Sequence, residues 1–236
     1  MTMTSKMNNE IKMKADIKLE SDILRAMTWE PLLRMEKIGV TARKGVITLT
    51  GKVESFMKKT EAEETAKKAR GVVAVVNDIE IQLNNQTTKQ DHDIAADLQK
   101  AFRANWDISA DKITVSVEKG WITLKGDLEW SYQRDAAQAA TRQIKGVTGL
   151  TNDITIRNVT IDKIEKMEIE KALVLSSAID DREIHVTVTG NIVSLGGIVS
   201  TLYEKEQAGR IAQNTPGVLG VENGLAIAPG SSQPNP

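Results

Sequence analysis

The sequence predicts an α+β fold of three tandem modules, each a two-layer sandwich with the element order αββαβ. Three observations predict this arrangement: an internal repeat without gaps, apolar residues that alternate on either side of a tight turn, and alanine-rich helical segments that end at glycine. In each module two helices are expected to cover one face of a three-stranded sheet.

The repeat is anchored by glycines that recur at fixed spacings. Gly45 and Gly120 are 75 residues apart, and Gly126 and Gly197 are 71 residues apart. The third copy carries Asn191 in place of the first of these glycines. The glycines that mark the fold are Gly45, Gly51 and Gly71 in copy one, Gly120, Gly126 and Gly146 in copy two, and Gly197 and Gly217 in copy three.

Two strands and a turn are predicted around the first glycine of each copy. Ile38, Val40 and Ala42 alternate with polar residues, as expected of a strand with one buried face. The following pair, Lys44-Gly45, is a turn signal because glycine accepts a positive φ at little cost. Its counterparts are Lys119-Gly120 and Gly190-Asn191.

Helices are expected on both sides of this hairpin. A second helix is predicted over residues 55–70, 131–145 and 201–214, where small residues such as Ala62 and Ala66 let the helix lie close to the sheet. The first helix of each copy follows Asp16, Asp91 or Asp162, which we expect to cap the helix start and to favour its dipole.

These elements place the modules at residues 16–83, 91–157 and 162–228. Outside them we expect an N-terminal arm (1–15), a polar linker (84–90) and a disordered tail (229–236). Neither a secretory signal peptide nor a transmembrane segment is evident, so the sequence as given predicts a cytoplasmic protein. A periplasmic location is the alternative if a signal peptide has been removed.

The order of the motifs resembles that of the BON domain family (bacterial OsmY and nodulation). The first copy reads Gly45-VITLT-Gly51 and Gly71-VVAVVN-Asp78, and the resemblance covers about residues 16–227. It implies a bacterial binding module linked to the cell envelope, osmotic stress and phospholipid interaction. Some relatives act as periplasmic chaperones, and others, fused to a LysM domain, bind potassium.

Catalytic chemistry finds little support, so we expect no enzyme activity, no cofactor and no metal site. His92 and His185 occupy non-equivalent positions and are expected at the surface. The net charge of −1 gives no bulk attraction to nucleic acid. Asn77-Asp78 and Asn152-Asp153 suggest ion binding, but an asparagine in such a strand more often satisfies a backbone group.

Aromatic residues are the candidates for partner or membrane binding. Trp121 follows a turn, and its neighbour Ile122 points into the core, so Trp121 is expected to point outward. The other candidates lie where the second strand meets the second helix: Phe56, Trp130, Tyr132 and Tyr203. The alternative is that these side chains seal contacts between modules.

Three functions remain open from the sequence. The leading hypothesis is a non-enzymatic stress-linked module that binds phospholipid surfaces or client proteins through its exposed sheet face and the aromatic edge of copy two. The second is a structural protein that forms homo-oligomers, dimers or filaments, through sheet faces or edges. The third is a sensor of potassium or of a small ligand.

Overall fold

The computed structural model describes residues 3–84, 88–157, 166–175, 184–215 and 217–228, and it confirms the α+β fold of three BON-like modules. Module one contains α1 (Met3–Trp29), β1 (Ile38–Arg43), β2 (Val46–Val53), α2 (Phe56–Lys67) and β3 (Ala74–Ile81). Module two contains α3 (Asp91–Ala104), a short 3-10 helix (Ala110–Lys112), β4 (Ile113–Glu118), β5 (Trp121–Leu128), α4 (Ser131–Arg142) and β6 (Gly149–Ile156). Module three contains α5 (Lys166–Leu175), β7 (Ile184–Thr189), β8 (Ile192–Val199), α6 (Leu202–Gln213), β9 (Gly220–Asn223) and β10 (Ala226–Ile227).

Each sheet is built in the same way. A hairpin pairs the first strand antiparallel to the middle strand, and the second helix then returns the chain so that the last strand runs parallel to the middle one. The register is the same in all three modules, since Leu49, Leu124 and Leu195 lie opposite the asparagine of the last strand. This identity of register explains why the three copies align without gaps.

The last strand of module three is interrupted, which gives its sheet a fourth short strand. Both β9 and β10 pair with β8, and they keep the register of an unbroken strand. Between them the backbone N–H of Gly224 donates to the carbonyl of Leu195 at 2.9 Å. The departure of copy three from the repeat at Gly224 therefore breaks a strand without changing its place in the sheet.

Each module has its own core, closed by both helices on one face of its sheet. In module one Ile23 on α1, Leu49 on β2 and Ala66 on α2 are fully buried. The equivalent cluster of module two includes Leu98 and Leu124. A fold-marker glycine is also required within the sheet: a Cβ added at Gly51 on the middle strand β2, where φ is +127°, would lie 2.5 Å from the carbonyl oxygen of Lys37.

The acidic residue of the first helix has a different role from the one predicted. Helix α1 begins at Met3, so Asp16 lies inside it and does not cap it, and residues 3–15 are not an arm separate from this helix. The carboxylate of Asp16 instead accepts hydrogen bonds from the backbone N–H groups of Lys44 at 2.9 Å and Gly45 at 3.3 Å. Both turn residues have positive φ, and the carboxylate satisfies the N–H groups that this conformation turns away from the strand.

Module two repeats this contact. Asp91, the first residue of α3, accepts hydrogen bonds from Lys119 N at 2.8 Å and Gly120 N at 2.9 Å. The residue before it, Gln90, makes no side-chain cap. The third acid, Asp162, lies outside the described residues, as does the tail (229–236).

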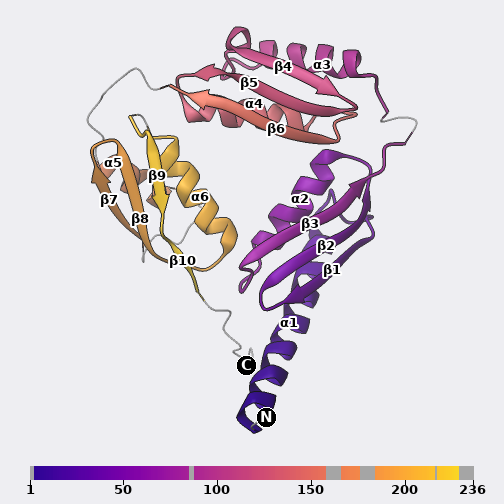
Figure 1. Cartoon of the computed structure of the whole chain (residues 1–236), viewed down its shortest axis with the longest axis vertical. Coiled ribbons are helices and arrows are strands. Elements are labelled where there is room, and N and C mark those ends of the chain that lie inside the picture. The colour runs from indigo at the N-terminus through magenta and orange to yellow at the C-terminus, as the bar shows by residue number, and fades with distance from the viewer. Residues whose placement is uncertain (1–2, 85–87, 158–165, 176–183, 216, 229–236) are drawn as a thin grey trace.

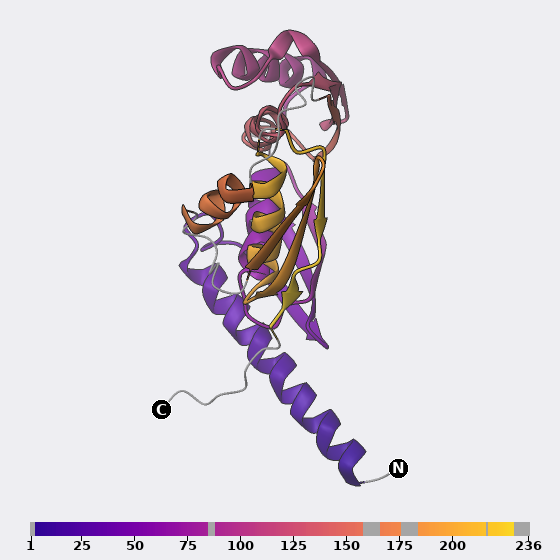
Figure 2. The same cartoon turned by 90° about the vertical axis from the view of Figure 1, so that its left-hand side faces the viewer.

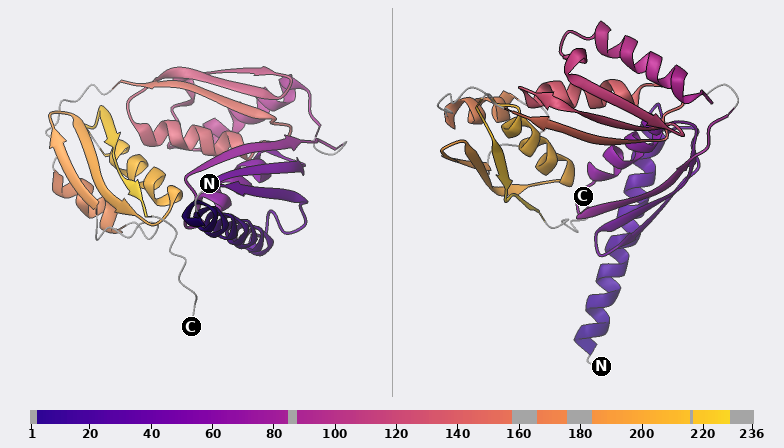
Figure 3. Two further views of the ribbon diagram at one scale, coloured as in Figure 1. Left: turned by 60° about the horizontal axis from the view of Figure 1, so that its bottom comes forward. Right: turned by 45° about the horizontal axis from the view of Figure 1, so that its top comes forward.

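The three modules lie at the corners of a triangle and follow one another head to tail (Figure 1). Helices α2, α4 and α6 lie on the inner sides of their modules, while the N-terminal half of α1 projects beyond module one (Figure 2). Figure 3 shows the same three-cornered arrangement from two further directions. In the part of the chain that is described, no helix combines the length and the apolar character needed to cross a membrane.

Candidate functional site

Trp121 is the first residue of β5 and lies on the outer face of the module-two sheet. Its ring lies over Gly149 of β6, where an added Cβ would overlap the indole. The indole Nε1–H donates to Thr151 Oγ1 at 3.0 Å, and 49 % of the residue remains exposed. Gly149 thus gives the ring room to lie flat on the sheet, with its other face open to a partner.

The same position is apolar and exposed in the other two modules. Val46 stands there in module one and Ile192 in module three, where Gly220 again leaves room for the side chain. Beside them Val73 and Leu219 are exposed, and their backbone N–H groups donate to the carbonyls of the turn residues. We call these the turn-end patches: Val46 and Val73 in module one, Trp121 in module two, and Ile192 and Leu219 in module three.

Only Trp121 of these patch residues was identified from the sequence. The available signal was an apolar residue directly after each turn, at a position whose neighbour points into the core. In module two Thr148 takes the place of Val73 and Leu219, so the aromatic ring makes most of that patch.

The other predicted aromatic residues do not gather around Trp121. Trp130 follows the far end of β5, and an eight-residue strand is roughly 25 Å long. Trp121 therefore lies at the opposite end of β5 from Trp130 and Tyr132, so the three do not form one aromatic cluster. Trp130 is half-buried at the start of α4, where its backbone N–H donates to Gln133 Oε1 at 3.1 Å, and Tyr132 is exposed.

Phe56 and Tyr203 lie in contacts between modules, as in the alternative considered from the sequence. Phe56, the first residue of α2, packs against the core of module two. The centre of the Tyr203 ring on α6 lies 5.2 Å from Nζ of Lys68, the residue that caps the C-terminus of α2. Both rings are thus engaged within the chain.

The contacts between modules follow a cyclic pattern. Phe56 at the start of α2 packs on module two, and Leu202 at the start of α6 packs on module one. Ser131 occupies the equivalent position of α4 and is buried. Helix α4 meets module three nearby, where Asn214 Nδ2 donates to Asp135 Oδ2 at 3.3 Å. The start of each second helix therefore lies against the next module around the triangle.

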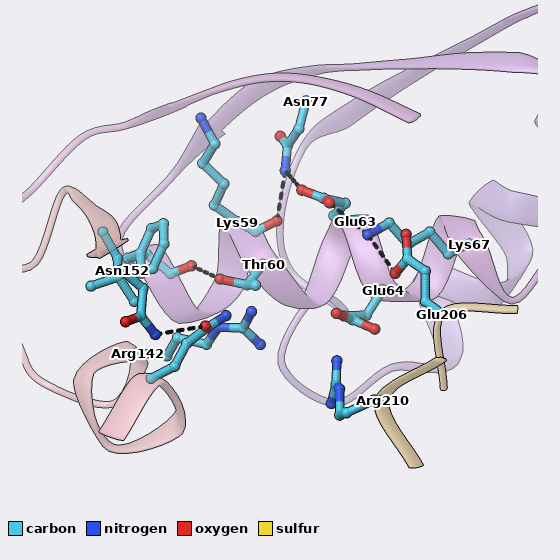
Figure 4. Close-up of a pocket in the computed structure, with 13 residues that line it drawn as sticks. Lys59, Thr60, Glu63, Glu64, Lys67, Asn77, Arg142, Asn152, Glu206 and Arg210 are labelled. Atoms are coloured by element: carbon cyan, nitrogen blue, oxygen red, sulfur yellow. Dashed lines mark hydrogen bonds and ion pairs between the residues drawn. The ribbon is translucent and has the colours of Figure 1, made fainter. Parts of the chain in front are cut away.

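A central pocket of about 370 Å³ lies where α2, α4 and α6 meet (Figure 4). Its charged lining residues are Lys59, Glu63, Glu64, Lys67, Arg142, Glu206 and Arg210. Lys67, only 13 % exposed in its side chain, lies 2.9 Å from Glu63 and 3.0 Å from Glu206. Because Glu206 belongs to module three, this lysine joins the first module to the last.

This ion-pair cluster shifts the pKa of Glu63 and the pKa of Lys67. Burial alone raises the pKa of Glu63, but hydrogen bonds from Lys67 and Asn77 outweigh it and bring the pKa below its ordinary value. Burial lowers the pKa of Lys67, but its bonds to Glu63 and Glu206 outweigh burial and raise that pKa. Both charged forms are therefore favoured in the folded chain.

The strand asparagines hold backbone groups. Asn77 Nδ2 donates to the carbonyl of Lys59 on α2 at 3.1 Å, and its Oδ1 accepts from Ile79 N at 3.3 Å. Asn223 makes the same pair of contacts in module three, to Lys205 and Leu225. Asn152 Nδ2 donates to the side-chain Oε1 of Gln138 instead of a backbone carbonyl, and its Oδ1 accepts from Ile154 N at 3.3 Å. These asparagines fasten the last strand to the second helix.

The residues that the structure describes contain no group of three or more His, Asp or Glu side chains placed to hold a metal ion. Both histidines are exposed, and His92 contacts only the neighbouring Asp93 at 3.3 Å among the described ion pairs.

Comparison with known proteins supports the repeat. The BON domain family model matches residues 15–82, 90–158 and 162–229. "Osmotically-inducible protein Y" of Escherichia coli (strain K12) is 24 % identical over 143 residues, which cover 57 % of this chain and 71 % of that protein.

Two solved structures also align with the chain. CdsD, described as a structural protein of the type III secretion system of Chlamydia trachomatis, aligns over 90 % of this chain and 93 % of its own, at 18 % identity and a TM-score of 0.24. Its C-terminal domain aligns over 90 % of this chain and 98 % of its own, at 19 % identity and the same TM-score. A TM-score of this size carries no argument about fold or function.

Proposed function

Because the chain belongs to the BON domain family, we propose that it is a non-enzymatic binding protein that holds apolar segments of client proteins on its three turn-end patches. The name of its osmotically inducible relative favours a role in stress, when proteins lose structure and expose such segments. The observation that carries the proposal is the recurrence of an exposed apolar side chain at one equivalent position, directly after the turn, on the outer face of all three sheets: Val46, Trp121 and Ile192.

The surroundings of the patches suit a polypeptide. Beside Val46 a hollow of about 590 Å³ is lined by Thr41, Ala42, Arg43, Lys44 and Thr48. An apolar side chain of the client would enter on the Val46 side, and the polar residues would meet its backbone. Exposed apolar residues rimmed by polar ones are typical of protein-interaction surfaces.

Three equivalent patches also favour weak multivalent binding. Each patch offers one or two apolar side chains, so a single contact is weak. A client segment that reaches a second patch binds it at a high effective concentration, which raises the overall affinity without new contacts. Such binding tolerates many client sequences, because apolar contact requires no particular register.

A phospholipid surface is the second candidate, favoured by two other tryptophans. Trp29 ends α1 and is 82 % exposed, and Trp106, two residues after α3, is 91 % exposed. Tryptophan is favoured where an apolar medium meets water, as at the surface of a bilayer. These residues are separate from the turn-end patches, so the two functions are separable by mutation.

The test compares two sets of substitutions in the full chain. The first combines Val46→Ser, Trp121→Ser and Ile192→Ser, and the matched control combines Trp29→Ser and Trp106→Ser. Client binding is measured as suppression of the aggregation of a chemically denatured model protein. Lipid binding is measured by flotation with phosphatidylglycerol vesicles, and circular dichroism checks folding.

We expect the patch variant to lose most of the suppression while the control variant retains it. Suppression at the wild-type level by a folded patch variant would refute client binding at the patches. The single variant Trp121→Ser serves the same purpose if the triple variant does not fold. Loss of flotation only in the Trp29 and Trp106 variant would favour the phospholipid function.

A further inference from the structure

We propose that the central pocket is a binding site for a small carboxylate anion, held by the guanidinium of Arg142 in place of an acidic side chain that module one lacks. This site is independent of the turn-end patches and of the proposed client binding. It involves side chains of all three modules (Figure 4).

The second helices of the three modules are arranged cyclically around the central pocket. Thr60, Asp135 and Glu206 occupy one equivalent position of the repeat, 75 and then 71 residues apart. Each lies one turn after the residue at which its helix meets the next module. A residue at this position therefore faces the C-terminal half of the second helix of the next module.

At two corners of the triangle this residue is an acid with a partner across the interface. Glu206 of module three pairs with Lys67 of module one at 3.0 Å. Asp135 of module two accepts a hydrogen bond from Asn214 of module three at 3.3 Å, with Arg210 Nε at 4.0 Å. Both acids thus contact basic or amide groups near the end of the next helix.

At the third corner the acid is missing. The residue of module one equivalent to Glu206 is Thr60, and the residue of module two equivalent to Lys67 is Arg142. The hydroxyl of Thr60 donates to the carbonyl of Phe56 in its own helix at 2.6 Å and supplies no negative charge. A basic residue is retained at this corner, but its carboxylate partner is not.

The guanidinium of Arg142 correspondingly has one donor without a partner. Its Nε is buried and has no hydrogen-bond partner in the described part of the chain. The carboxylates of Glu61 and Glu63 lie close enough to be influenced by its charge, but neither forms an ion pair with it among the described residues. An unpaired buried donor is costly, and a carboxylate would relieve the cost with two parallel hydrogen bonds to the guanidinium.

The remaining charges favour a singly charged ligand. Four basic residues line the pocket, Lys59, Lys67, Arg142 and Arg210, against the three acids Glu63, Glu64 and Glu206, so the lining carries a net charge of +1. A ligand with two negative charges would be repelled by Glu64, whereas one carboxylate replaces the single missing charge. The pocket volume of about 370 Å³ leaves room for a short organic chain on that carboxylate.

The first experiment follows Arg142 directly. Side-chain Nε–H signals of the arginines are recorded by ¹⁵N NMR while sodium acetate replaces sodium chloride at constant ionic strength. We expect one signal, absent from the Arg142→Gln variant, to shift and saturate by about 100 mM acetate, where a millimolar site is filled. No saturable shift would overturn the proposal, and a stronger response to inorganic phosphate would overturn the assignment to a carboxylate.

The second experiment supplies the missing acid. Acetate at about five times its Kd is expected to raise the Tm of the wild type by about 2–4 °C. Thr60→Glu should lose this response and melt higher than the wild type without acetate. Arg142→Gln should also lose the response, and Lys125→Gln, which removes one exposed charge from β5, should keep it. A response that persists in Thr60→Glu or Arg142→Gln would overturn the assignment.

Discussion

Glu206 on α6 accepts a hydrogen bond from Lys67 on α2 at 3.0 Å, although 139 residues separate them in the sequence. The bond closes the triangle, because it joins the last module to the first. The side chain of Lys67 is largely shielded from water, so this contact is expected to contribute more than an ordinary surface ion pair.

Removing this cation should weaken the closure. In Lys67→Met, Glu63 and Glu206 lose their shared partner, and we expect the free energy of unfolding to fall by about 1–3 kcal/mol. Urea denaturation measures the loss, and small-angle scattering should show a larger radius of gyration. Lys52→Met, which breaks the exposed pair with Glu80, should change stability by less than about 0.5 kcal/mol. Equal effects of the two variants would contradict this prediction.

The same cluster predicts a dependence of stability on pH. Glu63 has a folded pKa below its ordinary value of 4.5, so its contribution is present above that value and is lost as the pH falls through the folded pKa. Lys67 has a raised pKa, so its contribution is present below its ordinary 10.5 and is lost as the pH rises through the folded pKa. Urea midpoints of the wild type should therefore fall in acid more steeply than those of Glu63→Gln. Parallel acid limbs in the two proteins would exclude Glu63 as a cause.

The contact between the first helix and the turn offers a third test. Asp91→Ala leaves the N–H groups of Lys119 and Gly120 without their acceptor, so we expect a loss of about 1–2 kcal/mol in the free energy of unfolding. Asp93→Ala is the matched control, because Asp93 lies in the same first turn of α3 and contacts only the exposed His92 among the described residues. Chemical denaturation compares the two, and a loss as large in Asp93→Ala would assign the effect to the helix dipole instead.

The strand asparagine offers a fourth test. Asn77→Ala removes the bonds that fasten β3 to Lys59 and Glu63, and we expect a loss of about 1–3 kcal/mol. The neighbouring Asp78→Ala, at an exposed position, should have little effect on thermal unfolding. If potassium raised the Tm of the wild type but not of Asn77→Ala, this asparagine would have the ion-binding role that the sequence left open.

Most of each module was predictable because it depends on local signals. Lys44-Gly45 indicated the turn, and the alternation around Val40 indicated which face of the strand is buried. The role of Asp16 was not predictable in this way, because it depends on where a helix of unknown length passes the turn. The separation of Trp121 from Trp130 followed from the length of β5, which the local pattern around each tryptophan does not reveal.

The central pocket depends on how the modules pack, which the repeat alone does not determine. Phe56 and Leu202 each pack on a neighbouring module, but they and Ser131, at the equivalent position of α4, differ in size and polarity, so the sequence has no common pattern there. Thr60 stands where the other two modules carry an acid. This difference points to a site only because the structure shows Glu206 and Asp135 in contact with neighbouring modules. Local periodicity thus predicts the modules, whereas the site depends on contacts between distant segments.

The modules pack head to tail within one chain, and this distinguishes the molecule from an assembly of separate subunits. A homotrimer with this geometry would carry the same residue at all three corners, and any change would appear three times. Joining the copies in one chain removes that constraint, so one corner can carry Thr60 while Asp135 and Glu206 stand at the others. Covalent linkage thereby permits three similar modules to enclose a single asymmetric centre without a change of fold.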